Sequence, residues 1–86
     1  MNIYVGNLSY SLWPDELKAV FEPFGMVSST RIVGDFETGR SFGYGFVEMP
    51  NDEEAVKAMA ALNGTELKGR RIRCAKGRIR RERKHV

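Results

Sequence analysis

The stretch RSFGYGFVEM at residues 40–49 constrains the fold of this chain more than any other segment. In it, Phe42, Tyr44 and Phe46 alternate with a serine and two glycines. Since successive side chains of a β-strand point to opposite faces of a sheet, the three rings share one face and the glycines share the other. The rings therefore either build a core while glycines face solvent, or lie on a sheet face that no other layer covers.

The number of helices available to cover the sheet decides between these alternatives. Alternating or β-branched segments predict four strands, at residues 3–5, 27–33, 40–49 and 71–74. Helix-start residues, apolar residues at helical spacing and a terminal glycine predict two helices, from Pro14 to Gly25 and from Asn51 or Asp52 to Gly64. The order βαββαβ predicts an α+β, ferredoxin-like sandwich with two helices on one face of a four-stranded antiparallel sheet.

One layer of helices leaves the other face of the sheet open. The aliphatic residues of each strand must face the helices, so the residues between them are expected on the open face. This expected open-face set comprises Tyr4, Phe42, Tyr44, Phe46, Glu48, Arg71 and Arg73. Gly43 and Gly45 then point inward, and we expect them to leave room where the helices press closely on the centre of the sheet. An additional layer over the rings is the alternative, and only the C-terminal tail remains to supply it.

Length and composition limit what else the chain can be. With 86 residues, of which 42% are hydrophobic, we expect one domain around one core. The single cysteine, Cys74, cannot form an intramolecular disulfide and is expected in the core. No charged leader followed by an apolar run opens the sequence, and no long apolar span follows. We therefore expect a cytoplasmic protein without membrane association, and a monomer.

The charge of the chain is unevenly distributed. The net charge is +3, yet residues 76–86 hold six basic side chains and one acidic side chain, whereas the remainder carries −2. This asymmetry predicts a domain at residues 1–76 and a basic tail at residues 77–86 that is disordered without a ligand. A basic arm on a nearly neutral body favours a polyanionic partner, while a localisation signal and simple solubilising charge remain alternatives for the tail.

Aromatic rings beside arginines on an open sheet face suit single-stranded nucleic acid. Every base has a flat π face that can stack on a ring, and the guanidinium groups expected nearby, of Arg31, Arg71 and Arg73, can bind phosphates. A duplex hides the faces of its bases, so such a surface should prefer unpaired strands.

Two motifs on the expected strands resemble a known family. IYVGNL at residues 3–8 is similar to the RNP2 hexamer, and FGYGFVEM at residues 42–49 is similar to the RNP1 octamer, of the RNA recognition motif. The resemblance covers residues 2 to about 76, and the chain resembles the small single-domain RNA-binding proteins of bacteria and cyanobacteria. It implies that Tyr4 and Tyr44 each stack a base and that Phe46 packs against sugars or between two nucleotides.

The resemblance also implies polar contacts around these rings. Arg71 and Arg73 would contact the RNA backbone or the edges of bases. Asn2 would make similar contacts beside the aromatic rings. The first octamer position is Phe42, where the family usually has Lys or Arg, and Arg40 or Arg31 could partly replace that charge. The predicted RNA-binding residues are Asn2, Tyr4, Arg31, Arg40, Phe42, Tyr44, Phe46, Arg71, Arg73, Lys76 and Arg78.

Three classes of function follow, in order of preference. The first is a non-enzymatic binder of short single-stranded RNA, and binding of single-stranded DNA to the same surface is part of this expectation. The second is a protein-binding module that uses the sheet face or the helical face for a partner peptide. An enzyme comes last, because the sequence has no phosphate-binding glycine loop, no metal-ligand spacing and no base to activate a nucleophile. We expect no cofactor and no metal.

Overall fold

The structure of the chain is a computed structural model that describes residues 1–35 and 37–77. The predicted contact Arg78 and the predicted tail beyond Gly77 lie outside the described residues. The elements, in chain order, are β1 (Asn2–Gly6), α1 (Pro14–Phe21), the 3₁₀ helix η1 (Glu22–Phe24), β2 (Ser29–Gly34), β3 (Ser41–Glu48), α2 (Asp52–Leu62), β4 (Glu66–Leu67), β5 (Arg70–Arg71) and β6 (Arg73–Lys76).

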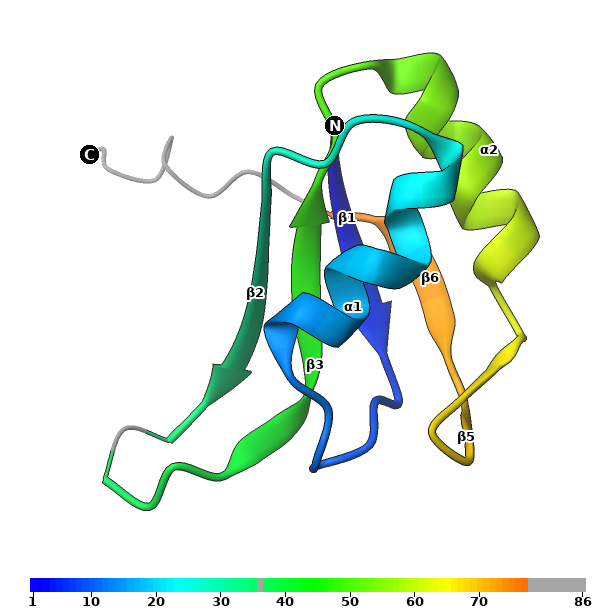
Figure 1. The fold of residues 1–86 in the computed structure, drawn as a ribbon. Helices are drawn as coiled ribbons and strands as arrows, with labels where there is room; N and C mark the ends of the chain where they lie inside the picture. Colours follow the sequence, from blue (N-terminus) through cyan, green and yellow to red (C-terminus); the bar gives the residue numbers. More distant parts are fainter. Residues whose placement is uncertain (36, 78–86) are drawn as a thin grey trace.

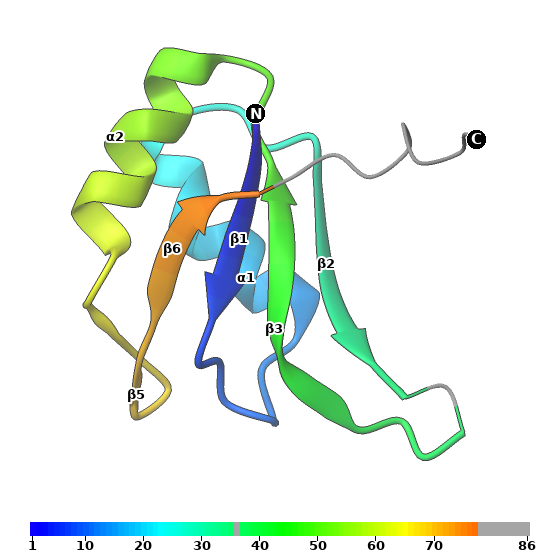
Figure 2. The same cartoon turned by 180° about the vertical axis from the view of Figure 1, so that it is seen from behind.

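Four strands form one antiparallel sheet with the order β2-β3-β1-β6, and both helices lie on the same face of it (Figure 1). Seen from behind, the sheet lies in front of the helices, and no helix within the described residues covers this second face (Figure 2). The predicted α+β, ferredoxin-like architecture is therefore confirmed. No helix in the described ranges is long and apolar enough to cross a membrane.

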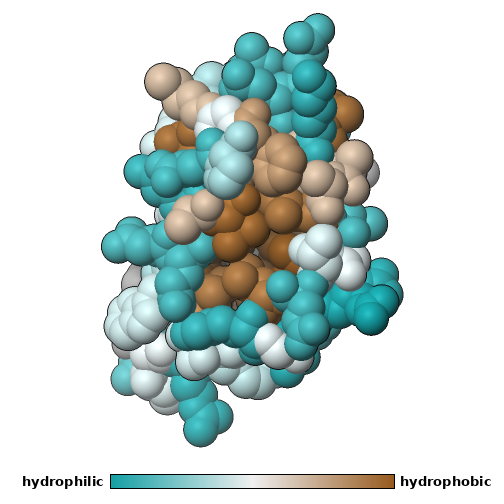
Figure 3. All heavy atoms as spheres, turned by 45° about the vertical axis from the view of Figure 1, so that its right-hand side comes forward, coloured by the Kyte–Doolittle hydropathy of each residue, from teal (hydrophilic) through white to brown (hydrophobic). Residues whose placement is uncertain are grey.

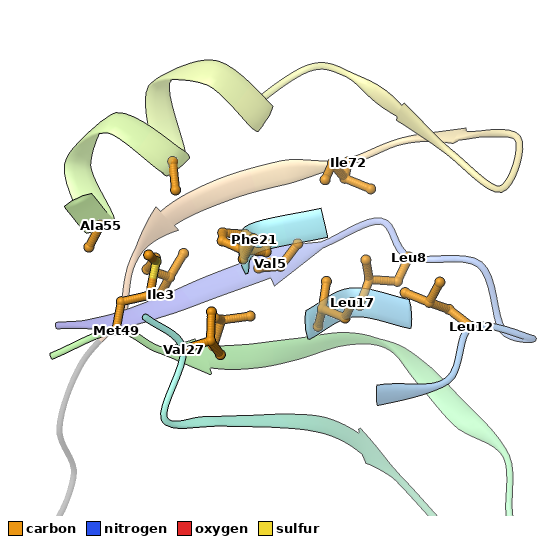
Figure 4. Packing of buried hydrophobic residues seen from close by; sticks show 12 residues of the cluster. Ile3, Val5, Leu8, Leu12, Leu17, Phe21, Val27, Met49, Ala55 and Ile72 are labelled. Carbon is orange, nitrogen blue, oxygen red and sulfur yellow. The ribbon is translucent and has the colours of Figure 1, made fainter. Parts of the chain in front are cut away.

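The core lies between the helices and the sheet (Figure 4). Phe21 and Leu17 from α1 and Ile3 from β1 are fully buried, and burial of each such side chain contributes about 1.5–3 kcal/mol. The remaining buried apolar residues are Val5, Leu8, Leu12, Val27, Val47, Met49, Ala55, Ala58 and Ile72. The aliphatic residues that were expected to face the helices do so, and this fixes the direction of the residues between them.

The first helix begins as the sequence indicates, with Pro14 in its first turn. Trp13 precedes it, and its backbone N–H donates a 2.8 Å hydrogen bond to Oε1 of Glu16, which supplies one capping contact and lowers the pKa of that carboxyl. Lys68, which also bonds to Glu16, lowers it further. The indole of Trp13 is 69% exposed, so this residue caps by its backbone and adds nothing to the core.

The fourth strand of the sheet differs from the prediction of residues 71–74. Arg71 lies in β5 and pairs with Glu66 of β4 in a separate two-stranded hairpin, while the sheet strand β6 begins at Arg73. The reason lies at Ile72, whose carbonyl accepts from the N–H of Gly64 and whose N–H donates to the carbonyl of Thr65. These bonds attach Ile72 to the turn after α2, and pairing with β1 starts only beyond it.

The inward glycines of β3 have a different cause from the one expected. A Cβ on Gly45 would collide with the carbonyl oxygen of Arg31 and lie 3.1 Å from the Cα of Ile32. Both atoms belong to the backbone of β2, so the closest approach at Gly45 is between neighbouring strands. A Cβ on Gly43 would lie 3.1 Å from the ring of Tyr10, which is in the loop after β1.

Candidate nucleic-acid interface

Three aromatic rings meet on the sheet face that the helices leave open. Tyr4 comes from β1, and Tyr44 and Phe46 come from β3, with Tyr4 paired across the strands with Phe46 and Gly6 with Tyr44. The ring centroids are 5.8 Å apart for Tyr4–Tyr44, 6.0 Å for Tyr4–Phe46 and 6.2 Å for Tyr44–Phe46, within the range of favourable aromatic pairs. All three side chains are half-buried. We call Tyr4, Tyr44 and Phe46 the aromatic platform.

The position of Tyr4 in the platform depends on Gly6. Ile3 and Val5, which alternate with Tyr4 and Gly6 along β1, are fully buried on the helical side. Tyr4 and Gly6 therefore point to the open face. A Cβ on Gly6 would lie 2.5 Å from Oη of Tyr4 and 2.9 Å from two of its ring carbons. The ring of Tyr4 therefore lies along β1, over the space that Gly6 leaves free.

Arg31 adds a positive charge to the platform. It lies opposite Phe46 in the β2–β3 register, and its Cζ is 5.4 Å from the centroid of the Phe46 ring, which is a cation–π contact. No acidic side chain in the described part of the chain forms an ion pair with Arg31. Its guanidinium donors thus remain available to a ligand that lies on the rings.

Polar residues border the platform on two sides. Asn2 of β1 and Ser29 of β2 both lie opposite Glu48 of β3. The side chains of these three residues therefore share one end of the open face. The N-terminal amine lies 3.5 Å from Oε2 of Glu48. On the other side, Arg73 of β6 lies opposite Gly6 and is exposed. The open face therefore offers hydrogen-bonding groups at one end and guanidinium groups at both lateral edges.

Other predicted contacts lie away from the platform. Arg71 is exposed in the β4–β5 hairpin, outside the four-stranded sheet. Lys76 lies opposite Ile3, and since paired residues point to the same face, its side chain leaves the sheet on the helical side. Arg40 lies in the connection between β2 and β3. Of the predicted arginines within residues 1–35 and 37–77, only Arg31 and Arg73 border the platform.

Phe42 does not continue the row of rings that simple alternation predicts. The β2–β3 register changes between the pairs Val33–Tyr44 and Gly34–Ser41, and Gly43 has a φ of +87° that favours glycine. Phe42 lies inside this irregularity, and its side chain is 56% exposed.

Phe42 instead lines a hollow together with Tyr10, which is 67% exposed and which sequence reasoning missed. Tyr10 lies in the loop between β1 and α1, where no strand or helix periodicity signals the direction of a side chain. Only its aromatic character next to the RNP2-like segment could have drawn attention to it.

The described residues offer little material for catalysis. They contain no group of three His, Cys, Asp or Glu side chains that could hold a metal ion. Burial raises the pKa of the Cys74 thiol from 9.0 to about 11, so the thiol is neutral at physiological pH and a poor nucleophile.

The chain is similar to a family of known proteins over most of its length. The family model for the RNA recognition motif matches residues 3–73. RbpB of Nostoc sp. is 46% identical over 83 residues, which cover 96% of this chain and 81% of that protein.

Solved structures share the fold as well. The crystal structure of RNA binding protein PG1 superposes with a TM-score of 0.89 at 41% identity, and the match covers 93% of this chain and 96% of that one. A Sex-lethal protein in complex with RNA superposes with a TM-score of 0.87 at 31% identity, and covers 94% of this chain and 48% of that one.

Proposed function

The chain belongs to the RNA recognition motif family, whose members bind RNA and are not enzymes, and we propose that it binds short single-stranded RNA on its aromatic platform. The observation that carries this proposal is the meeting of Tyr4, Tyr44 and Phe46 on the sheet face opposite the helices, with the guanidinium of Arg31 over one ring. A patch of partly exposed rings bordered by polar and charged groups is typical of a surface that binds a partner.

Stacking supplies the affinity in this proposal. A base on an aromatic ring contributes about 1–3 kcal/mol by alanine substitution, and the platform has room for a short run of bases. The family resemblance assigns bases to Tyr4 and Tyr44. Because Phe46 lies directly opposite Tyr4 and carries the Arg31 contact, we propose it as a stacking residue of equal rank.

Charged and polar groups then hold the backbone and the base edges. Arg31 and Arg73 border the platform where phosphates of a bound strand would pass. Asn2 and Glu48 can exchange hydrogen bonds with base edges at the far end. The rings stack any base with or without a 2′-hydroxyl, so we propose that single-stranded DNA competes for the same surface.

We propose that the basic tail adds an electrostatic arm to this surface. Gly77, the last described residue, donates its N–H to the carbonyl of Asn2 in a 2.6 Å hydrogen bond. The chain therefore leaves the sheet beside Asn2, at an edge of the open face, and a basic segment that starts there is within reach of a bound strand.

Substitution of platform residues tests the proposal. Tyr44→Ala and Phe46→Ala should each weaken binding of a short single-stranded RNA about ten-fold or more, because each removes a ring on which a base or sugar packs. Fluorescence anisotropy with a labelled RNA measures the affinity, and circular dichroism verifies the fold. Val56→Ala, which shortens an exposed apolar side chain on α2, far from the platform, is the control and should bind like the parent. Parental affinity in both platform variants would refute the proposal.

One observation favours a second candidate function, the binding of a partner peptide on the helical side. Figure 3 shows apolar atoms gathered in the middle of a face whose margins are hydrophilic. Partly exposed apolar side chains of α1, η1, α2 and β4 pack against the core on the helical side, namely Val20, Phe24, Met59, Leu62 and Leu67. A peptide that bound there would leave the platform variants with parental affinity for it.

A further inference from the structure

A second cluster of rings and guanidinium groups lies at the end of the sheet where β1 ends and β3 begins. Tyr10 is 67% exposed and Phe42 is 56% exposed, and together they line a hollow whose other walls include Asp35, Thr38, Arg40 and Ser41. None of the predictions from sequence included Tyr10, and the platform does not extend to it. We call the hollow between Tyr10 and Phe42 the rim notch.

The backbone is built so that these two rings face one hollow. Phe42 and Gly43 lie in the irregularity of the β2–β3 register, and a bulge of this kind redirects a side chain away from its regular position. Gly43, at a φ of +87°, also leaves room for Tyr10, whose ring would lie 3.1 Å from a Cβ at that position. An alanine at position 43 would meet both a strained conformation and the ring.

Tyr10 is held by a network that reaches across the molecule. The guanidinium of Arg70 lies over its ring, with Cζ 5.7 Å from the centroid, and Nη2 of Arg70 donates a 2.7 Å hydrogen bond to Oδ1 of Asn7. Nδ2 of Asn7 in turn donates to the carbonyl of Arg71 at 2.7 Å. The loop after β1 and the β4–β5 hairpin are thereby joined at the ring.

The rim notch repeats the chemistry of the platform and adjoins it. A guanidinium lies over an aromatic ring at both places, at 5.4 Å for Arg31 over Phe46 and at 5.7 Å for Arg70 over Tyr10. The N–H of Leu8 donates to the carbonyl of Gly43 at 2.8 Å, so the loop that carries Tyr10 leaves β1 beside the residue that follows Phe42 and precedes Tyr44. The notch therefore lies at the Tyr44 end of the sheet.

We infer that the rim notch binds the base of a nucleotide that flanks those on the platform, against the rings of Tyr10 and Phe42, with its phosphate on Arg40. The inference rests on the proposed function and extends the bound strand beyond the sheet. Guanidinium groups beside exposed rings fit a nucleotide, which combines an anionic phosphate with a π face. Asp35, one of whose oxygens already accepts from the N–H of Glu37 at 2.9 Å, keeps acceptor capacity for the amino groups of a base.

Oligonucleotide length separates the rim notch from the platform. Two pools of random single-stranded RNA are compared. The shorter pool consists of trinucleotides, matched to the three platform rings, and the longer pool consists of octanucleotides. Tyr10→Leu and Phe42→Leu should each weaken binding of the longer pool at least about five-fold, the lower end for one stacked base, and leave the shorter pool unchanged. Phe46→Ala should weaken both pools, and Val56→Ala should weaken neither.

Two further readouts do not depend on a ring substitution. Trp13 is the only tryptophan and lines an adjoining hollow with Tyr10, so its fluorescence should change with the longer pool and not with the shorter one. Arg40→Gln should reduce the salt slope of the longer pool by about 0.7, the value for one phosphate contact on a single strand, without changing that of the shorter pool. If Tyr10→Leu and Phe42→Leu bind the longer pool like the parent, the inference that the rim notch binds a base is refuted. In that case a loss in Phe46→Ala would still support the platform, whereas parental affinity in Phe46→Ala would refute the proposed function itself.

Discussion

At Gly6, the absence of a side chain determines where a neighbouring ring lies. The ring of Tyr4 occupies the space above this glycine, and two of its carbons lie 2.9 Å from where a Cβ would stand. The glycine is therefore part of the candidate interface, although it offers no group to a ligand.

Gly6→Ala should weaken RNA binding without unfolding the protein. The added methyl group collides with the flexible Tyr4 side chain rather than with backbone, so the ring moves and the sheet stays intact. We expect a loss of affinity of about five-fold or more, comparable to the loss of one weakly stacked base, measured by anisotropy with a short single-stranded RNA. Tyr4→Phe, which keeps the ring and removes only the hydroxyl, is the control and should bind like the parent. An unchanged affinity in Gly6→Ala would show that the position of Tyr4 does not matter to the ligand.

Among the elements, β3 shows both the reach and the limit of prediction from sequence. Alternation placed Tyr44 and Phe46 on the open face, because a period of two and a single layer of helices permit no other arrangement. The same alternation failed at Phe42, since a change of register depends on how two strands meet and leaves no periodic signal. Arg71 was misplaced for a similar reason, because Ile72 bonds to the turn after α2 instead of to β1.

Local sequence also could not explain why β3 carries its glycines. The pattern predicted that Gly45 points inward, and the structure confirms this, since Gly45 is buried and lies opposite Val5 and Ile32. Its cause, the approach of the β2 backbone, is a distance between strands that are joined by a loop, and composition contains no information about it. Tyr10 was missed because its position depends on a contact with Arg70, which lies sixty residues further along the chain.

Gly45→Ala should destabilise the fold. A methyl group at this position meets the carbonyl of Arg31 in β2, and backbone atoms of a paired strand cannot move aside cheaply. Overpacking of this kind costs about 1–3 kcal/mol, which for a domain of this size lowers the melting temperature by several degrees per kcal/mol. Thermal denaturation followed by circular dichroism measures the change. Ser29→Ala, on the exposed end of β2, should leave the melting temperature nearly unchanged, and an equally small effect for Gly45→Ala would contradict the account of its role.

For the whole molecule, the arrangement of layers and the distribution of charge point to the same surface. Two helices cover one sheet face, and the other face carries the rings together with Arg31 and Arg73. The helices carry an excess of acidic side chains, with Asp52, Glu53 and Glu54 in the first turn of α2 alone. We therefore expect this charge distribution to attract an anionic strand to the open face and to repel it from the helical face.

Salt dependence tests this charge distribution. If the open face and the tail neutralise about four phosphates, log affinity should fall with log salt at a slope near −2.8, which is about a 50-fold loss from 50 to 200 mM salt. The slope is obtained from a titration at four or five salt concentrations. A ligand bound through apolar contacts on the helical side would give a nearly flat profile, and such a profile for RNA would contradict electrostatic binding at the open face.

The central claim is that single-stranded RNA lies on the sheet face opposite the helices, and an NMR titration of the amide signals with a short random RNA pool tests it most directly. The account predicts that the largest shifts occur in β1 and β3, at and around Tyr4, Tyr44 and Phe46, with smaller shifts in β2 and β6. Shifts confined to α1 and α2, with β1 and β3 unperturbed, would contradict it.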